Sequence, residues 1–268
     1  MTLTLEVAVP PTGRQGVIDL GRAEWIRVRS SRASILFSLF IVVLPLAWCF
    51  QSAVSAQDNW QSFSESQRTA FDPVSSTMAG LYLSQVLIGV WAALFFTGEY
   101  ATGSMHTTLV SAPRRLRLFA AKCLVAAIVM FVVMELAAVA SFALGQMLLS
   151  AAGPPASVGL GSPVVVHALL GTGVYAALLA VLCVSLGALI RFTAGAALVV
   201  VAITSVIYIV SIVSTQFQTL VRFTPVGIFR DQISSVPADS QWGGIAVMAL
   251  GTLVVAVVGY TSFAHRDA

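Results

Sequence analysis

The stretch LFAAKCLVAAIVMFVVMELAAVASFALGQMLL, residues 118–149, decides the fold class of this chain. Its only charged residues are Lys122 and Glu135. About 20 apolar residues suffice for a helix to cross a membrane, and this stretch as one helix would extend about 48 Å. We therefore expect it to span a membrane, with its first turn at the interface, where Lys122 can extend its amine to water.

Further apolar stretches flank this one on both sides. They cover residues 34–55, 75–97, 164–190, 194–215 and 242–264. The whole chain of 268 residues is 58% hydrophobic and only 9% charged, whereas soluble domains carry about 25% charged residues. Backbone groups in lipid must be paired within their own segment. The sequence thus predicts an all-α integral membrane protein with about six transmembrane helices.

The charges predict how these helices are oriented. With six spans, eleven of the 14 lysines and arginines lie on one side, which the positive-inside rule assigns to the cytoplasm. We expect a cytoplasmic segment 1–33, a transmembrane domain 34–264 and a cytoplasmic tail 265–268 in the cell membrane. The alternative is signal-peptide cleavage after Val54-Ser55-Ala56, but the segment before this apolar run is longer than a usual charged n-region.

No motif of a catalytic, cofactor or metal site is present. The sequence lacks GxxxxGK[ST], HExxH and GxSxG, so a phosphate-binding loop, a common zinc site and a nucleophile elbow are not indicated. The basic residues lie in short segments between apolar runs, which does not indicate nucleic-acid binding. The three cysteines lie inside apolar runs without CxxC spacing, as expected for packing residues.

Glu135 is the one acidic residue near the centre of a predicted span. Ionisable residues at membrane depth usually face a bundle interior or water. Glu135 is either a carboxylate in a proton or substrate path, or a protonated or hydrogen-bonded packing residue.

Two segments on the predicted cytoplasmic side are more specific. Residues 98–122 read GEYATGSMHTTLVSAPRRLRLFAAK, a helix-prone, exposed polar segment with a basic return to the membrane. Tied to two spans, it could transmit a push from a cytosolic partner. The alternative is an ordinary positively charged inner loop.

This pattern resembles the loop of type-2 ABC transporter permeases, which carries Glu, Gly-Thr, Thr-Leu, Pro, Arg and Ala-Lys at this spacing. In that family the loop forms the coupling helix that docks on the ATPase subunit. The resemblance implies that the ATPase-coupling residues are Glu99, Tyr100, Gly103, Ser104, His106, Thr108, Leu109, Pro113 and Arg115, with Lys122 closing the pattern. His106 stands where the family commonly has Arg, and Ser104 stands where it more commonly has Thr.

A second match precedes the first span. Residues 24–32, EWIRVRSSR, look like the N-terminal elbow of actinobacterial-type members of this family. We expect an interfacial helix in which Val17, Ile18, Trp25 and Val28 share one face, with Trp25 at the headgroups and arginines near anionic lipid. The interfacial residues are Glu24, Trp25, Arg27, Arg29 and Arg32.

Residues 216–241 form the third region of interest. The family has a hairpin here that re-enters the outer leaflet, and the mildly apolar composition suits one. A plain outer loop suits it equally.

The resemblance implies a permease subunit of an ATP-driven exporter in a bacterial cell membrane. It would bind no cofactor itself; a cytosolic ABC ATPase would use ATP, and a second identical or related permease subunit would complete the path through the lipid. The few fixed charges favour an amphipathic or hydrophobic substrate. The alternatives are an intramembrane enzyme or ion-coupled secondary transporter that uses Glu135, and a scaffold without transport.

Overall fold

The computed structural model describes residues 16–105, 107–108, 114–151, 158–206, 223–234 and 241–266. All regular structure in these ranges is helical, which confirms the predicted all-α class. Among the described residues, five helices are long and apolar enough to cross a membrane. They are α2 (Arg32–Asn59), α5 (Leu81–Ala101), α7 (Arg115–Ala151), α8 (Pro163–Ile190) and α13 (Gln241–Arg266).

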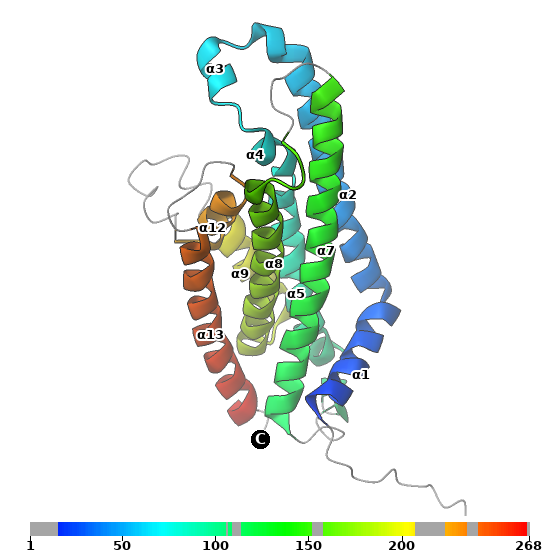
Figure 1. Ribbon diagram of the computed structural model, residues 1–268. Helices are drawn as coiled ribbons and strands as arrows, with labels where there is room; N and C mark the ends of the chain where they lie inside the picture. Colours follow the sequence, from blue (N-terminus) through cyan, green and yellow to red (C-terminus); the bar gives the residue numbers. More distant parts are fainter. Residues whose placement is uncertain are drawn as a thin grey trace, which may run out of the picture.

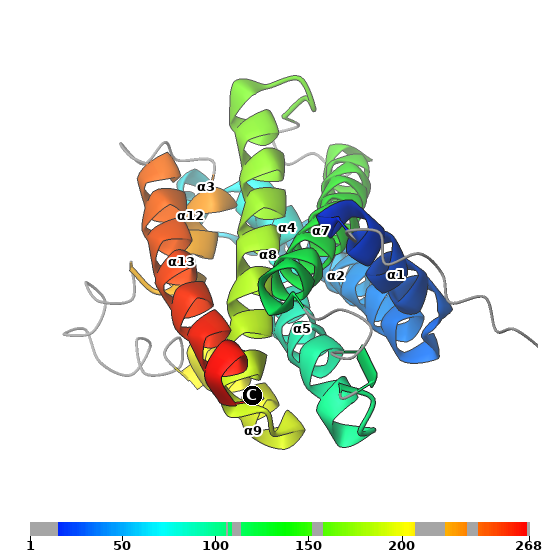
Figure 2. The ribbon, with the colours of Figure 1, turned by 90° about the horizontal axis from the view of Figure 1, so that it is seen from below.

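These helices form one bundle around α8. Helix α8 packs against α5, α7 and α13, and α2 packs against α5 and α7 (Figures 1 and 2). Large apolar side chains of α2 and α13 point outward: Ile35, Leu36, Leu39 and Phe40 on α2, and Leu250, Leu253, Val254 and Val257 on α13. Apolar faces of this size are rare on water-soluble proteins. The chain is therefore a multi-pass helical membrane protein.

The long helix in the region of the predicted span 75–97 lies further along the chain than predicted. Helix α4 (Pro73–Met78) ends before Gly80, and α5 begins at Leu81 and continues to Ala101. A Cβ atom at Gly80 would lie 2.7 Å from the Cα atom of Pro45. Only glycine, which has no Cβ atom, lets the backbone at this break approach α2 this closely.

The predicted span 194–215 is described only in its first part. Helix α9 (Thr193–Val201) continues as a π-helical turn, η2 (Ala202–Val206), and the rest of the span lies outside the described residues. Helix α9 packs against α5 at Gly89, where a Cβ atom would meet the Val200 side chain. The other predicted spans correspond to α2, α7, α8 and α13, each of which extends further than predicted.

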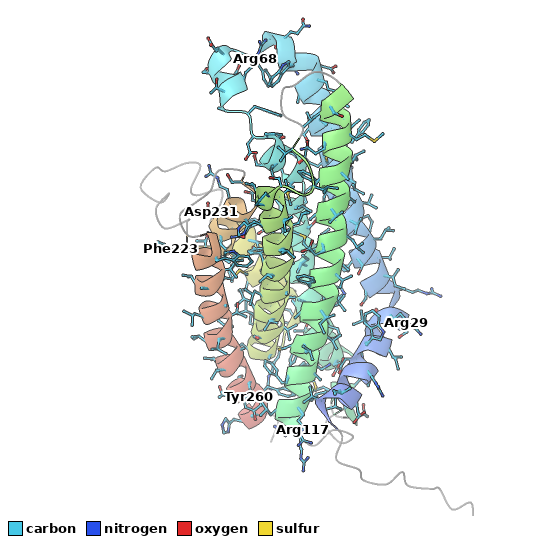
Figure 3. The ribbon with its side chains drawn as sticks, in the orientation of Figure 1. Arg29, Arg68, Arg117, Phe223, Asp231 and Tyr260 are labelled. Atoms are coloured by element: carbon cyan, nitrogen blue, oxygen red, sulfur yellow. The ribbon has the colours of Figure 1, made fainter. Side chains whose placement is uncertain are left out.

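The two ends of the bundle differ in charge. The lower end in Figure 1 holds helix α1 (Val17–Ser30), residues 102–105 and 107–108 after α5, the α8–α9 turn and the C-terminal end of α13. Arg29 and Arg117 mark this end in Figure 3. The upper end holds η1 (Trp60–Ser62), α3 (Glu65–Thr69) and α4, with Arg68. We call the lower end the basic end.

Helix α12 (Pro225–Gln232) lies near the opposite end, packed against α8 and α13. Phe229 is fully buried, with ring centroids 5.1 Å from Tyr82 and 5.0 Å from Tyr175. Gln232 is also fully buried, and its side chain occupies the space that a Cβ atom at Gly171 would need. This part of region 216–241 is thus integrated into the bundle. The remainder of the region, on either side of residues 223–234, lies outside the described residues.

Candidate functional site

A group of buried charges occupies the basic end of the bundle. Lys122, in the second turn of α7, is completely buried. Its Nζ atom lies 2.8 Å from Glu24 Oε1 on α1 and donates a hydrogen bond to Glu99 Oε1 at the end of α5. Both carboxylates are about 95% buried. These contacts join three helices that are far apart in the sequence.

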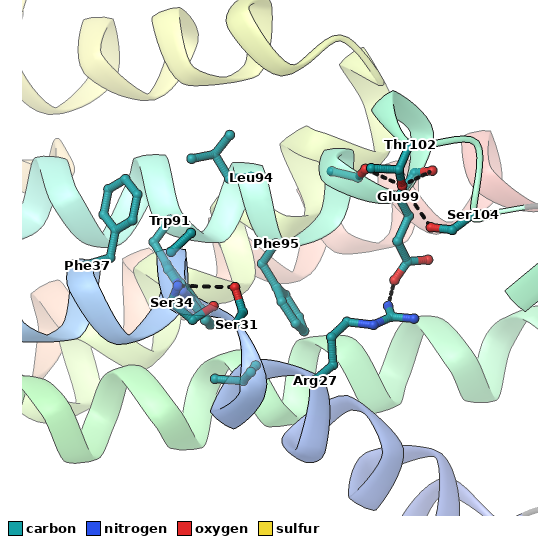
Figure 4. Close-up of a pocket in the computed structure, with 13 residues that line it drawn as sticks. Arg27, Ser31, Ser34, Phe37, Trp91, Leu94, Phe95, Glu99, Thr102 and Ser104 are labelled. Carbon is teal, nitrogen blue, oxygen red and sulfur yellow. Dashed lines mark hydrogen bonds and ion pairs between the residues drawn. The ribbon is translucent and has the colours of Figure 1, made fainter.

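Arg27 completes what we call the ion cluster: Glu24, Arg27, Glu99 and Lys122. Its Nη1 atom lies 3.4 Å from Glu24 Oε2, one helical turn earlier, and also pairs with Glu99 Oε1 (Figure 4). The Arg27 side chain remains 42% exposed, whereas the other three side chains of the cluster are buried. Arg27 is therefore the member of the cluster that contacts solvent. The Lys122 ammonium also lies 5.2 Å from the centroid of the Phe95 ring.

The charge balance of the ion cluster explains why it can be buried. Desolvating a charge is expensive, and only good geometry with opposite charges offsets that cost. Two carboxylates face two cations here, so the cluster carries no net formal charge. Loss of one partner from such a buried pair costs about 3–5 kcal/mol because the other charge is left alone. The cluster therefore ties α1, α5 and α7 together strongly.

The expectation that Lys122 reaches water is wrong. Helix α1 covers the first turns of α7 and brings Glu24 over the amine, so the lysine is paired rather than solvated. Glu99 was expected in an exposed segment and is also buried. In the sequence, Glu99 follows one apolar run and Lys122 lies within the next, while Glu24 precedes the first run by ten residues. Nothing in the spacing says that these residues meet.

Arg115 lies against the end of α13. Its Nη1 atom donates to Ala264 O at 2.7 Å and to Phe263 O at 3.4 Å. Arg191, which adopts a left-handed conformation with φ 57°, donates to Ser262 O at 3.0 Å. Cations at the last carbonyls of a helix satisfy orphan acceptors and complement its dipole. The structure thus gives Arg115 an internal role in fixing α13.

The remaining predicted coupling residues differ in their exposure. Tyr100 packs on Phe96 and lies under the Arg191 guanidinium, 5.5 Å from the ring centroid. Gly103 is exposed with φ +69°, in a turn after α5. Ser104 and Thr108 are half-buried, and Ser104 O accepts a hydrogen bond from the Thr108 hydroxyl. His106, Leu109 and Pro113 lie outside the described residues.

Helix α1 lies along α7 rather than apart from the bundle. Val28 is buried, whereas Ile18 and Trp25 are exposed, so the predicted apolar face of α1 is divided between the bundle and the outer surface. Glu24 sits on the bundle-facing side with Val28. The outward side instead carries Ile18 and Trp25 next to Arg22 and Arg29, and Arg32 is exposed at the start of α2.

Glu135 lies half-way along α7 and is partly buried. Its side chain contacts the α8 backbone at Gly173, where a Cβ atom would collide with the carboxylate. Oε1 is buried and has no hydrogen-bond partner in the part of the chain that the structure describes. Within that same part, no three His, Cys, Asp or Glu residues come together as a metal site would require.

Comparisons with known proteins do not assign the chain to a family. No protein-family model matches the chain, and no curated protein matches it significantly. The class that the fold defines is a multi-pass helical membrane protein, and the resemblance to type-2 permeases rests on the two segments quoted above.

Proposed function

We propose that this chain is the membrane-spanning permease subunit of an ATP-driven ABC exporter. The observation that carries the proposal is the ion cluster. It joins the two segments that resemble the type-2 permeases, residues 24–32 and 98–122, through Glu24, Glu99 and Lys122. Both segments would then act as one mechanical unit at the basic end.

In this proposal a cytosolic ATPase docks on the turn that follows α5. Gly103 and Thr107 are exposed there, while Glu99 and Arg115 anchor the two sides of the segment to the bundle. A push on the turn would reach α1 and α7 through the ion cluster and α13 through Arg115. ATP binding in the partner would thereby shift the population between two arrangements of the bundle.

The remaining parts of the proposal follow from charge and composition. The basic end would face the cytoplasm of a bacterial cell, as the positive-inside rule requires. A second permease subunit, identical or related, would complete the path, and the chain itself would hold no cofactor. An amphipathic or hydrophobic substrate fits a bundle whose membrane-depth acid, Glu135, has no charged partner among the described residues.

Purification of the tagged chain in a gentle detergent tests this function. The proposal expects a soluble subunit with a phosphate-binding loop in the purified complex, together with ATP hydrolysis. Gly103→Pro should remove that subunit, because proline cannot adopt the positive φ of the turn. Gly161→Pro, in a turn at the opposite end, is the control and should retain it. Purification without any ATPase under conditions that preserve complexes contradicts the proposal.

A second candidate function rests on Glu135. A buried carboxylate oxygen without a partner among the described residues suits a proton-coupled carrier or an intramembrane enzyme. In reconstituted vesicles, such a function predicts transport or turnover without ATP that Glu135→Gln abolishes. Activity that depends on ATP and survives Glu135→Gln argues for the exporter instead.

A further inference from the structure

A pocket of about 320 Å³ lies beside the ion cluster, between the α1–α2 junction and the second half of α5 (Figure 4). Its two ends differ in chemistry. Arg27, Glu99, Thr102 and Ser104 line the end near the turn after α5, and Phe37, Trp91, Leu94 and Phe95 line the end deeper in the bundle. From Trp91 to Glu99 the α5 axis rises about 12 Å. A ligand that fills the pocket must therefore be polar at one end and apolar at the other.

Two residues that line the pocket each carry a buried side-chain polar atom without a hydrogen-bond partner within the described residues. Glu99 Oε2 accepts no hydrogen bond, although Glu99 is 95% buried. The indole Nε1 of Trp91, 98% buried, donates none. A buried polar atom without a partner costs free energy, and native proteins pair nearly all of them. The pocket thus calls for a ligand with a donor for Glu99 and an acceptor for Trp91 or Arg27.

The charge of the ion cluster limits the charge of that ligand. The cluster already balances two carboxylates against two cations. An added anion or cation would leave one charge uncompensated in a largely buried place, which is costly. A zwitterion adds charge of both signs: its anionic group can take the remaining donors of Arg27, and its cationic group can donate to Glu99 Oε2.

We propose that this pocket binds a zwitterionic phospholipid with a primary ammonium head, of the phosphatidylethanolamine type. The ammonium donates to Glu99 Oε2 and the phosphate accepts from Arg27. The glycerol region lies within reach of the Trp91 indole, and the acyl chains leave along Phe37 and Leu94 toward the apolar outer face of α2. Phosphatidylcholine has the same charges but no N–H group, so it cannot satisfy Glu99 Oε2 with a hydrogen bond.

The site would hold α1 and α2 against α5, since its lining residues come from all three helices. Such a lipid acts as a structural ligand of the basic end. This inference does not depend on the proposed exporter function, because binding needs neither ATP nor a partner subunit.

Native mass spectrometry of the detergent-solubilised full chain tests the proposal. The protein is titrated with phosphatidylethanolamine, phosphatidylcholine and phosphatidylglycerol of identical acyl chains. We expect the ethanolamine lipid to bind at least about tenfold more tightly than the choline lipid, as fits a hydrogen bond to a charged group. Equal affinity for phosphatidylethanolamine and phosphatidylcholine overturns the proposal, and so does tighter binding of phosphatidylglycerol than of phosphatidylethanolamine.

Three variants place the binding in this pocket. Ala33→Trp puts a large ring into it and should remove the tight binding, whereas Ala143→Trp, the same change at an exposed alanine of α7, should not. Trp91→Phe removes the indole N–H together with part of the ring system and should weaken binding about three- to tenfold. Unchanged binding in both Ala33→Trp and Trp91→Phe contradicts the assigned site. The lipid comparison in the unmodified chain decides the proposal even where a variant fails to fold.

Discussion

Lys122 Nζ lies 2.8 Å from Glu24 Oε1, inside the protein and out of contact with solvent. Glu24 belongs to a helix that precedes the first membrane span, and Lys122 belongs to the helix that follows the turn after α5. The pair therefore attaches the N-terminal helix to the helix that follows the turn we propose as the ATPase docking site. Its importance for stability and for coupling can be measured separately.

Replacement of Lys122 should destabilise the bundle. Lys122→Met leaves Glu24 and Glu99 as neighbouring buried acids with Arg27 as their one cation, at a cost of about 3–5 kcal/mol. For a chain of this size we expect the apparent melting temperature in detergent to fall by about 10 °C. Arg29→Met, on the exposed side of α1, is the control and should change it by about 1–2 °C at most. A Lys122→Met protein as stable as the unmodified chain would show that the cluster does not hold the helices together.

The guanidinium groups at the end of α13 should protect its last turn. Arg115→Ala removes the donor to Ala264 O and Phe263 O, so the amides near the C-terminus of α13 should exchange hydrogen several-fold faster. Hydrogen–deuterium exchange detected by mass spectrometry measures this exchange rate directly. Arg114→Ala is a neighbouring control at an exposed position and should leave α13 unchanged. Equal exchange in the two variants would contradict the assigned capping role.

Two glycines with different surroundings should respond in opposite ways to a methyl group. Gly80→Ala places Cβ within 2.7 Å of the Pro45 backbone, and such overpacking costs about 1–3 kcal/mol. Gly251→Ala on α13 meets nothing within 4 Å and should stabilise the helix by up to about 1 kcal/mol. Thermal stability in detergent should thus fall in the first variant and hold or rise in the second. A Gly80→Ala protein that is more stable than the Gly251→Ala protein would mean that the backbone at Gly80 does not approach α2.

The orientation of the bundle can be tested with single introduced cysteines in a chain whose three own cysteines are replaced by alanine. Thr69 and Thr107 are exposed at opposite ends. Thr69→Cys should react with a membrane-impermeant maleimide in intact cells, and Thr107→Cys only after permeabilisation. Labelling of Thr107→Cys in intact cells would place the basic end outside and remove the basis for a cytosolic partner.

The sequence predicted the fold class and most of the spans because hydrophobic runs of this length have few alternatives. It missed the break at Gly80, which depends on the approach of Pro45 from another helix. It also missed the partners of Lys122, Glu99 and Arg115, since each side chain is held by an element distant in the sequence. Periodicity within one segment carries no information about such contacts. The exposure of Gly103 and Thr107 agrees with the predicted exposed segment, whereas the turn at Gly103 interrupts the helix expected there.

The most direct test of the exporter account is photocrosslinking from the proposed docking turn. A photoreactive amino acid replaces Thr107 at the basic end or, as the control, Thr69 at the opposite end, and covalent products are identified after illumination of cells. The account predicts a crosslink from position 107 to a cytosolic protein with a phosphate-binding loop, and none from position 69. Efficient crosslinks from position 107 to lipid and to the chain's own residues, with no ATPase among the products, would contradict it.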